Sequence, residues 1–171
     1  MPRYVAFLRG VTPMNAKMPD LKRAFEAAGF TDVRTLLASG NVAFDARVAS
    51  NASLERRAEK AMQTELGKSF ATIVRGTAQL AALLETDPFE AYRVAPNAKR
   101  VVTFLRDPDA PAVKLPVERD GATIFGRVGA EVFTAYLPCD KGPVFMTLLE
   151  RTFGKDITTR TLDTVRKCAT A

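Results

Sequence analysis

The stretch that decides the fold runs from residue 3 to residue 45 and reads RYVAFLRGVTPMNAKMPDLKRAFEAAGFTDVRTLLASGNVAFD. Residues 3–9 are apolar on both faces of an extended chain, which predicts a strand in the middle of a sheet. Residues 19–28 carry apolar side chains at helical spacing between Pro19 and Gly29, which predicts a helix. Residues 33–38 and 42–45 then read as two strands. Gly40 and Asn41 predict the hairpin turn between them, because both residue types tolerate positive φ.

Two further elements complete the first half of the chain. Residues 53–66 predict a helix that ends at Gly67, and residues 70–75 predict a strand. The resulting strand–helix–strand–strand–helix–strand order is the ferredoxin-like arrangement. Right-handed crossovers then place the third strand between the first and the second, antiparallel to both. We therefore expect the connector 9–17 to lie beside the hairpin 39–41, at one end of the sheet.

The second half is less regular but also mixes helices and strands. Its composition predicts helices at 77–85, 143–153 and 161–169, a strand at 100–106, and a hairpin of 122–127 with 131–137. The fold class expected is α+β with two packed subdomains. Residues 1–76 would form the ferredoxin-like subdomain. Residues 77–171 would form the second subdomain, a smaller mixed antiparallel sheet with helices that include the C-terminal one.

Composition excludes several classes of chemistry. The chain has no histidine, which removes imidazole bases, Ser-His-Asp and Cys-His pairs and histidine metal sites. The two cysteines lie far apart and form no C-x-x-C pair, and no close acidic cluster suggests a cation site, so we expect neither a metal nor a cofactor. The first residues do not resemble a signal peptide, and no apolar run is long enough to span a bilayer. We therefore expect a cytoplasmic protein that does not bind membranes.

Charge is distributed unevenly along this basic chain, whose net charge is +6. Lys and Arg outnumber Asp and Glu by 12 to 7 in residues 1–76, but only by 13 to 12 in residues 77–171. A basic first half attracts anions, so a phosphorylated small molecule, a nucleotide or a nucleic acid is the expected partner. A basic surface that serves solubility alone is the alternative reading.

The candidate ligand-binding residues lie in the two loops of the first half: Arg9, Gly10, Asn15, Lys17, Ser39 and Asn41. Arg9 has the planar guanidinium that clamps phosphates, or it bonds loop carbonyls at the strand end. Residues 10–17 lead into a helix N-terminus, where backbone N–H groups hold anions and Lys17 adds charge, although most such connectors carry no ligand. For Asn41, turn chemistry is the simpler explanation.

Two other groups of residues have a functional and a structural reading. Arg160, Thr164 and Lys167 include positions at helical spacing in the predicted last helix and would form a second basic patch. The structural reading is that cations are favoured near a helix C-terminus. Cys139 lies two residues before Lys141, which would favour a reactive thiolate, or it is a loop cysteine without a role.

Several motifs resemble a bacterial family called domain of unknown function 1697. These are Leu8-Arg9-Gly10, Lys17-Met18-Pro19 with Leu21, Gly29 to Thr35, Ser39-Gly40-Asn41-Val42-x-Phe44, and, near the C-terminus, Thr159 to Leu162 with Thr164, Val165 and Lys167. The resemblance implies a two-part α+β fold with a ferredoxin-like first half, and it implies no activity. The chain departs from the family pattern at Thr12-Pro13-Met14, at Gly142-Pro143, and near Leu162, where a Trp is common.

These observations lead to one preferred function and two alternatives. The preferred function is binding of an anionic, phosphate-containing small molecule, nucleotide or nucleic acid at the loop end of the first sheet. One alternative is a phosphoryl or acyl-phosphate hydrolase, by analogy with ferredoxin-like acylphosphatases that use an anion-cradling loop and an Asn near the following hairpin. The other is an interaction module, monomeric or homodimeric, that carries out no chemistry. The sequence does not decide whether the protein is an enzyme.

Overall fold

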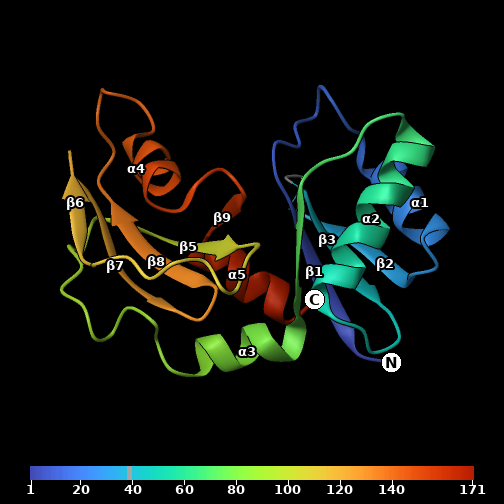
Figure 1. Cartoon of the computed structure of the whole chain (residues 1–171), viewed down its shortest axis with the longest axis horizontal. Coiled ribbons are helices and arrows are strands. Elements are labelled where there is room, and N and C mark those ends of the chain that lie inside the picture. Colours follow the sequence, from blue (N-terminus) through green and yellow to red (C-terminus); the bar gives the residue numbers. More distant parts are fainter. Residues whose placement is uncertain (38–39) are drawn as a thin grey trace. The chain divides into compact units, whose positions relative to one another are not determined.

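The structure is a computed structural model that describes residues 1–37 and 40–171. The chain forms two compact units: Met1–Ala82 together with Arg166–Ala171, and Leu83–Val165. The first unit is thus longer than the subdomain 1–76 expected from the sequence, and it also includes the last six residues of the chain. Both units combine helices with an antiparallel sheet, so the fold is α+β as expected (Figure 1).

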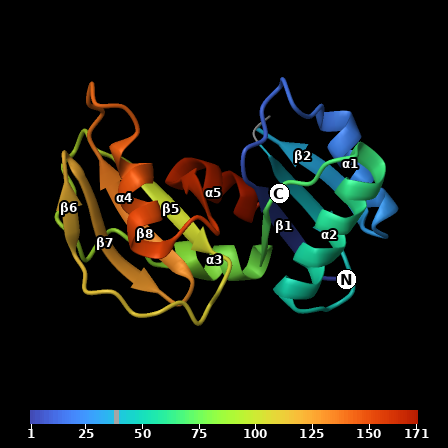
Figure 2. The ribbon, with the colours of Figure 1, turned by 45° about the horizontal axis from the view of Figure 1, so that its top comes forward.

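The first unit contains a four-stranded sheet in the order β2-β3-β1-β4. The strands are β1 (Arg3–Leu8), β2 (Thr31–Leu36), β3 (Asn41–Asp45) and β4 (Thr72–Gly76). The third strand lies between the first and the second and is antiparallel to both, as predicted. Helices α1 (Met18–Ala27) and α2 (Asn51–Leu66) pack on one face of this sheet (Figures 1 and 2).

The core of the first unit forms because β1 alternates its apolar side chains between the two faces of the sheet. Tyr4, Ala6 and Leu8 pack against the two helices, and Val5 and Phe7 on the other face are also fully buried. Both faces of β1 are therefore covered, as its apolar sequence predicted.

The ends of α2 are fixed by local interactions. The Ser50 side chain accepts a hydrogen bond from the Ser53 backbone N–H, which caps the first turn. Gly67 ends the helix at φ 72°, in the left-handed region that glycine adopts without strain. The start and the end of α2 therefore follow from the residue types at its two termini.

The second unit contains a five-stranded sheet in the order β6-β7-β8-β5-β9. The strands are β5 (Lys99–Leu105), β6 (Val117–Arg119), β7 (Ala122–Val128), β8 (Glu131–Tyr136) and β9 (Ile157–Thr161). The hairpin of β7 and β8 was predicted, whereas β6 and β9, the two edge strands, were not. Helix α4 (Val144–Phe153) packs against this sheet (Figure 2).

Two helices cross the division between the units. Helix α3 (Thr77–Glu85) begins in the first unit and ends in the second, and α5 (Leu162–Ala169) passes from the second unit to the first. In the described part of the chain, none of the helices has both the length and the apolar character that crossing a membrane requires.

Candidate functional site

The connector after β1 and the hairpin between β2 and β3 lie together, as the predicted topology required. The backbone N–H of Leu8 donates to the Gly40 carbonyl at 2.8 Å. A Cβ atom built on Gly40, which has φ 78°, would lie 3.1 Å from the Val11 side chain and from the Leu8 carbonyl oxygen. Glycine at position 40 therefore permits the close approach of the two loops.

Asn15 organises the connector from within. Its Oδ1 accepts a hydrogen bond from the Thr12 backbone N–H, and its Nδ2 donates to the Gly10 carbonyl, both at 2.8 Å. The Thr12 hydroxyl also accepts a bond from the Met14 backbone N–H at 3.2 Å. Both polar atoms of the Asn15 amide thus bind the loop backbone, so this predicted ligand residue has a structural task.

A hollow of about 260 Å³ lies where the connector enters α1. We call it the α1 hollow, and the residues that line it are Pro13, Met14, Asn15, Ala16, Lys17, Asp20, Leu66 and Lys68. Lys17 occupies the N-cap position of α1, in extended conformation, and no side chain caps this helix end. The partial positive charge of the helix N-terminus and two exposed ammonium groups therefore border one concave surface.

The negative charge in this hollow is compensated locally. Asp20 lies in the first turn of α1 and forms an ion pair with Arg23, one helical turn further along. An anion in the hollow would therefore meet a carboxylate whose charge is already paired, together with the two lysines. The arrangement favours binding of a small anionic group.

Asn41, another predicted ligand residue, is the first residue of β3 rather than a turn residue. Its side chain is fully buried, and its Nδ2 donates to the Leu36 carbonyl at 3.2 Å. Among the described residues of this turn, positive φ values occur at Leu37 and Gly40 instead. The prediction that Asn41 belongs to the turn was therefore wrong.

The buried position of Asn41 bears on the hydrolase alternative. That alternative needs an asparagine amide that can reach a phosphoryl group beside the connector. The Asn41 side chain is 0% exposed and bonded to the hairpin backbone. The described geometry therefore gives Asn41 a role in fixing the hairpin, and it does not provide the amide that the analogy requires.

Arg9 follows the last residue of β1. Its backbone N–H donates to the Ala71 carbonyl at 2.9 Å, and its side chain is half-buried. Arg9 does not line the α1 hollow, and the same is true of Gly10. Ser39, the remaining predicted ligand residue, lies outside the described residues.

The expected second basic patch is not a set of positions on one helix. Arg160 lies on β9, where its Nη1 donates to the Thr158 hydroxyl at 2.8 Å. Thr164 lies in the first turn of α5, and its backbone N–H donates to the Thr161 hydroxyl at 3.2 Å. Lys167 is exposed in the last turn of α5. Arg160 therefore lies just before the helix, while Thr164 and Lys167 lie on α5 three residues apart.

Sequence reasoning missed Lys68 as a site residue. Lys68 follows the C-terminal end of α2, 51 positions after Lys17 in the sequence, and only the fold brings the two into one hollow. The predicted topology, however, already indicated that Lys68 would lie near the connector after β1. In the predicted topology α2 runs parallel to β1, so the connector after α2 ends beside the connector after β1.

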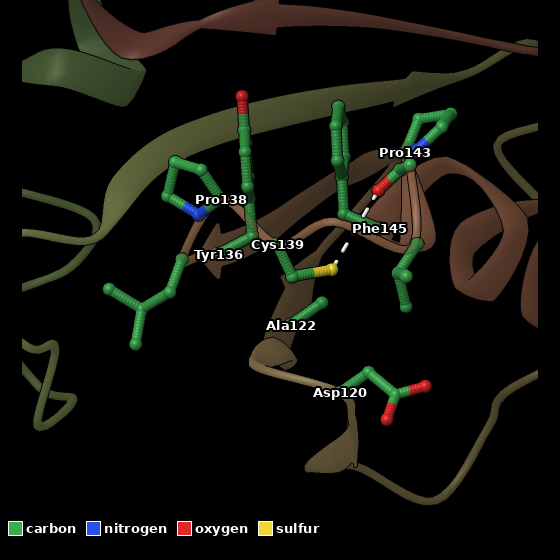
Figure 3. Close-up of a pocket in the computed structure, with 10 residues that line it drawn as sticks. Asp120, Ala122, Tyr136, Pro138, Cys139, Pro143 and Phe145 are labelled. Atoms are coloured by element: carbon green, nitrogen blue, oxygen red, sulfur yellow. Dashed lines mark hydrogen bonds between the residues drawn. The ribbon is translucent and has the colours of Figure 1, made fainter.

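Cys139 lies in the second unit, where it lines a hollow of about 230 Å³ (Figure 3). Its side chain is exposed, and its Sγ lies 3.9 Å from the Gly142 carbonyl oxygen, to which it donates. Lys141, which the sequence suggested as its partner, has its Nζ 3.3 Å from Asp120 Oδ1.

In the described parts of the chain, 1–37 and 40–171, no group of three or more Asp, Glu or Cys residues is placed to hold a metal ion.

The fold defines a class, an α+β protein of two units. Its first unit has a hollow where the connector after β1 enters α1. Residues 1–133 match a protein family described as a protein of unknown function (DUF1697), and the chain belongs to this family. The resemblance expected from the sequence is confirmed for that range. The motif at 159–167 lies outside the matched residues.

Comparison with solved structures finds a protein of similar fold. A conserved bacterial protein from Streptococcus pneumoniae is similar to this chain, with a TM-score of 0.72 and 19% sequence identity. The similarity covers 99% of this chain and 97% of the other, and at this identity it shows the fold alone. Comparison with the curated proteins finds no match.

Proposed function

We propose that the first unit binds a small phosphate-containing anion in the α1 hollow. The observation that carries the proposal is the shared lining: Lys17 and Lys68, far apart in sequence, border the same hollow at the uncapped N-terminus of α1. Ammonium groups and helix N-termini are two features that proteins commonly combine to hold phosphate. The excess of Lys and Arg over Asp and Glu in residues 1–76 also attracts anions, at longer range.

The size of the hollow favours a phosphate group over a large ligand. Its volume of about 260 Å³ lies just below the range of about 300–1,000 Å³ that is usual for drug-sized ligands. A phosphate or diphosphate group fits such a space, while the rest of a nucleotide or phosphorylated metabolite would extend into solvent. Nucleic acid would bind through its backbone phosphates alone, and its affinity would fall steeply with salt.

A thermal-unfolding screen tests this proposal. Pyrophosphate, nucleoside mono- and triphosphates and a short RNA are compared at low and at moderate salt. A ligand that binds only the native state stabilises it by about 2.7 kcal/mol at a concentration 100 times its Kd. We expect a phosphorylated small molecule to raise the unfolding midpoint at both salt concentrations.

Two double variants of equal charge locate the effect. Lys17→Gln with Lys68→Gln removes the two ammonium groups of the α1 hollow. Lys22→Gln with Lys60→Gln removes two exposed lysines of the same unit that do not line the hollow. We expect the first pair to abolish the midpoint shift and the second pair to keep most of it. Equal losses in both variants would show that the basic unit acts only as a charged surface, and would refute the proposed site.

A further inference from the structure

Two adjoining hollows lie in the second unit, along helix α4. The first is the hollow of about 230 Å³ that contains Cys139, and the second, of about 240 Å³, adjoins it. Asp120, Pro143 and Val144 line both. We call the two together the α4 groove, which runs between the β6–β7 turn and the helix. None of its residues belongs to the α1 hollow, so binding in this groove is independent of the function proposed for the first unit.

The first hollow of the groove is lined mainly by apolar side chains, with the Asp120 carboxylate at the border to the second hollow. Tyr136 and Phe145 stack with ring centroids 4.1 Å apart and planes inclined by 5°, and the two parallel rings stand between Pro138 and Pro143 (Figure 3). Because each ring already packs against the other, a ligand would meet ring edges and aliphatic atoms of the lining. This part of the groove therefore suits a compact apolar group.

The second hollow is cationic. Arg119, Lys141 and Arg151 line it, against the single carboxylate of Asp120. Asp120 is shared between Lys141, at 3.3 Å, and Arg119, at 3.9 Å. Arg151 forms no ion pair within the described part of the chain. The lining thus has an excess of positive charge that a bound anion would neutralise.

The helix end adds to this field where the two hollows meet. Helix α4 has ten residues, and its N-cap is Pro143, so no side chain caps its first turn. The positive end of the helix dipole lies at Pro143 and Val144, which line both hollows. An anionic head group near this point would lie next to the cationic hollow, and its apolar group would reach the aromatic pair.

We propose that the α4 groove binds a small amphiphilic anion, that is, a phosphate ester or carboxylate joined to a compact apolar group. The apolar group occupies the hollow beside Tyr136 and Phe145. The anionic group occupies the hollow lined by Arg119, Lys141 and Arg151. Neither part alone uses both halves of the groove, so the affinity depends on their being joined in one molecule.

Cys139 offers a site-specific readout, because its exposed side chain lines the apolar hollow whereas Cys168 is fully buried. In the native protein, iodoacetamide therefore reports on Cys139. The ligands to compare are phenyl phosphate, benzoate, inorganic phosphate and phenol. We expect phenyl phosphate or benzoate to slow the alkylation of Cys139 several-fold in a saturable manner. Inorganic phosphate and phenol at the same concentration should leave the rate unchanged.

Charge-matched variants connect the protection to the groove. Lys141→Gln with Arg151→Gln should remove the protection, measured in each variant as the ratio of alkylation rates with and without phenyl phosphate. Arg93→Gln with Lys114→Gln, two exposed positions of the same unit outside the groove, should keep it. The proposal is overturned by the absence of protection from both amphiphiles, by equal protection from inorganic phosphate alone, or by protection that survives in the groove variant.

Discussion

At the scale of single residues, Thr134 combines full burial with an unsatisfied polar atom. It lies on β8, its side chain is 0% exposed, and its hydroxyl has no hydrogen-bond partner among the described residues. A buried hydroxyl that makes no hydrogen bond loses its interaction with water and gains nothing in return. Thr134 should therefore lower the stability of the sheet that contains it.

Replacing Thr134 by Val should stabilise the protein. Val has nearly the same shape and fills the same space, but it removes the unpaired hydroxyl, so we expect a gain of about 1–2 kcal/mol. Chemical denaturation of the second unit measures this change. Thr103→Val is the control, because the Thr103 hydroxyl lies 2.9 Å from that of Thr159 and its loss should destabilise. A loss of stability in Thr134→Val would show that the hydroxyl is satisfied in solution.

Single residues also show where prediction from sequence succeeded and where it could not. Gly40 was assigned to a turn because its residue type tolerates positive φ, and the structure has it at φ 78°. Asn41 was assigned to the same turn for the same reason, yet it begins β3 and is fully buried. Residue preference is local, whereas the strand boundary depends on pairing with Phe7 of β1 across the sheet.

At the scale of elements, helix α2 protects the exposed side of an edge strand. Strand β4 lies at the edge of the first sheet, and the backbone N–H groups of Val74 and Thr72 donate to two α2 carboxylates, Glu55 at 2.9 Å and Glu59 at 3.2 Å. Glu55 and Glu59 are four residues apart, so they share one face of the helix. Pairing of two copies through β4 would have to displace both carboxylates.

Glu55→Ala should destabilise the first unit. The buried Glu55 carboxylate accepts the Val74 N–H, and its removal leaves that donor unsatisfied, at a cost of about 1–3 kcal/mol. Amide hydrogen exchange of Val74 measures the effect locally, and denaturation measures it globally. Glu65→Ala, an exposed position of the same helix, should change stability by less than about 0.5 kcal/mol. Equal effects of the two substitutions would show that the carboxylate does not hold the strand.

Elements with strong periodicity could be predicted, whereas the two edge strands of the second sheet, β6 and β9, could not. Helix α2 carries an apolar stripe, an N-cap and a terminal glycine, and its predicted and observed ranges differ by two residues at the start. Strand β9 has the sequence ITTRT, with little apolar alternation, and it forms because Leu105 and Thr103 of β5 offer it a partner. That pairing partner lies more than 50 residues away in sequence. The local sequence of β9 therefore does not reveal that a strand forms there.

At the scale of the whole molecule, the chain returns at its end to the unit where it began. Residues Arg166–Ala171 belong to the first unit, and Cys168 among them is fully buried. Arg3 of β1 binds this segment, because its Nε donates to the Ala171 carbonyl at 2.9 Å. The Nη1 of the same guanidinium donates to Asp45 Oδ1 of β3 at 2.8 Å. No local pattern in the sequence predicts this return, because it depends on tertiary packing alone.

A chain that ends at Val165 should have a less stable first unit. It loses the bond from the Arg3 guanidinium, and a hydrogen bond from a charged donor contributes about 1.5–3 kcal/mol. Faster amide hydrogen exchange in β1 and β3 would reveal the loss. Lys167→Gln, which changes an exposed side chain within the same segment, serves as the control and should leave the exchange rates unchanged. Unaltered protection of β1 and β3 in the shortened chain would contradict this role.

The proposal that the α1 hollow binds phosphate can be tested by isothermal titration of pyrophosphate into three proteins at moderate salt. These are the unmodified chain, Lys17→Gln with Lys68→Gln, and the charge-matched Lys22→Gln with Lys60→Gln. We predict at least about tenfold weaker binding for the first variant, a difference of about 1.4 kcal/mol, and nearly unchanged binding for the second. Equal affinity in all three proteins, or no measurable binding to the unmodified chain, would contradict a phosphate site in the α1 hollow.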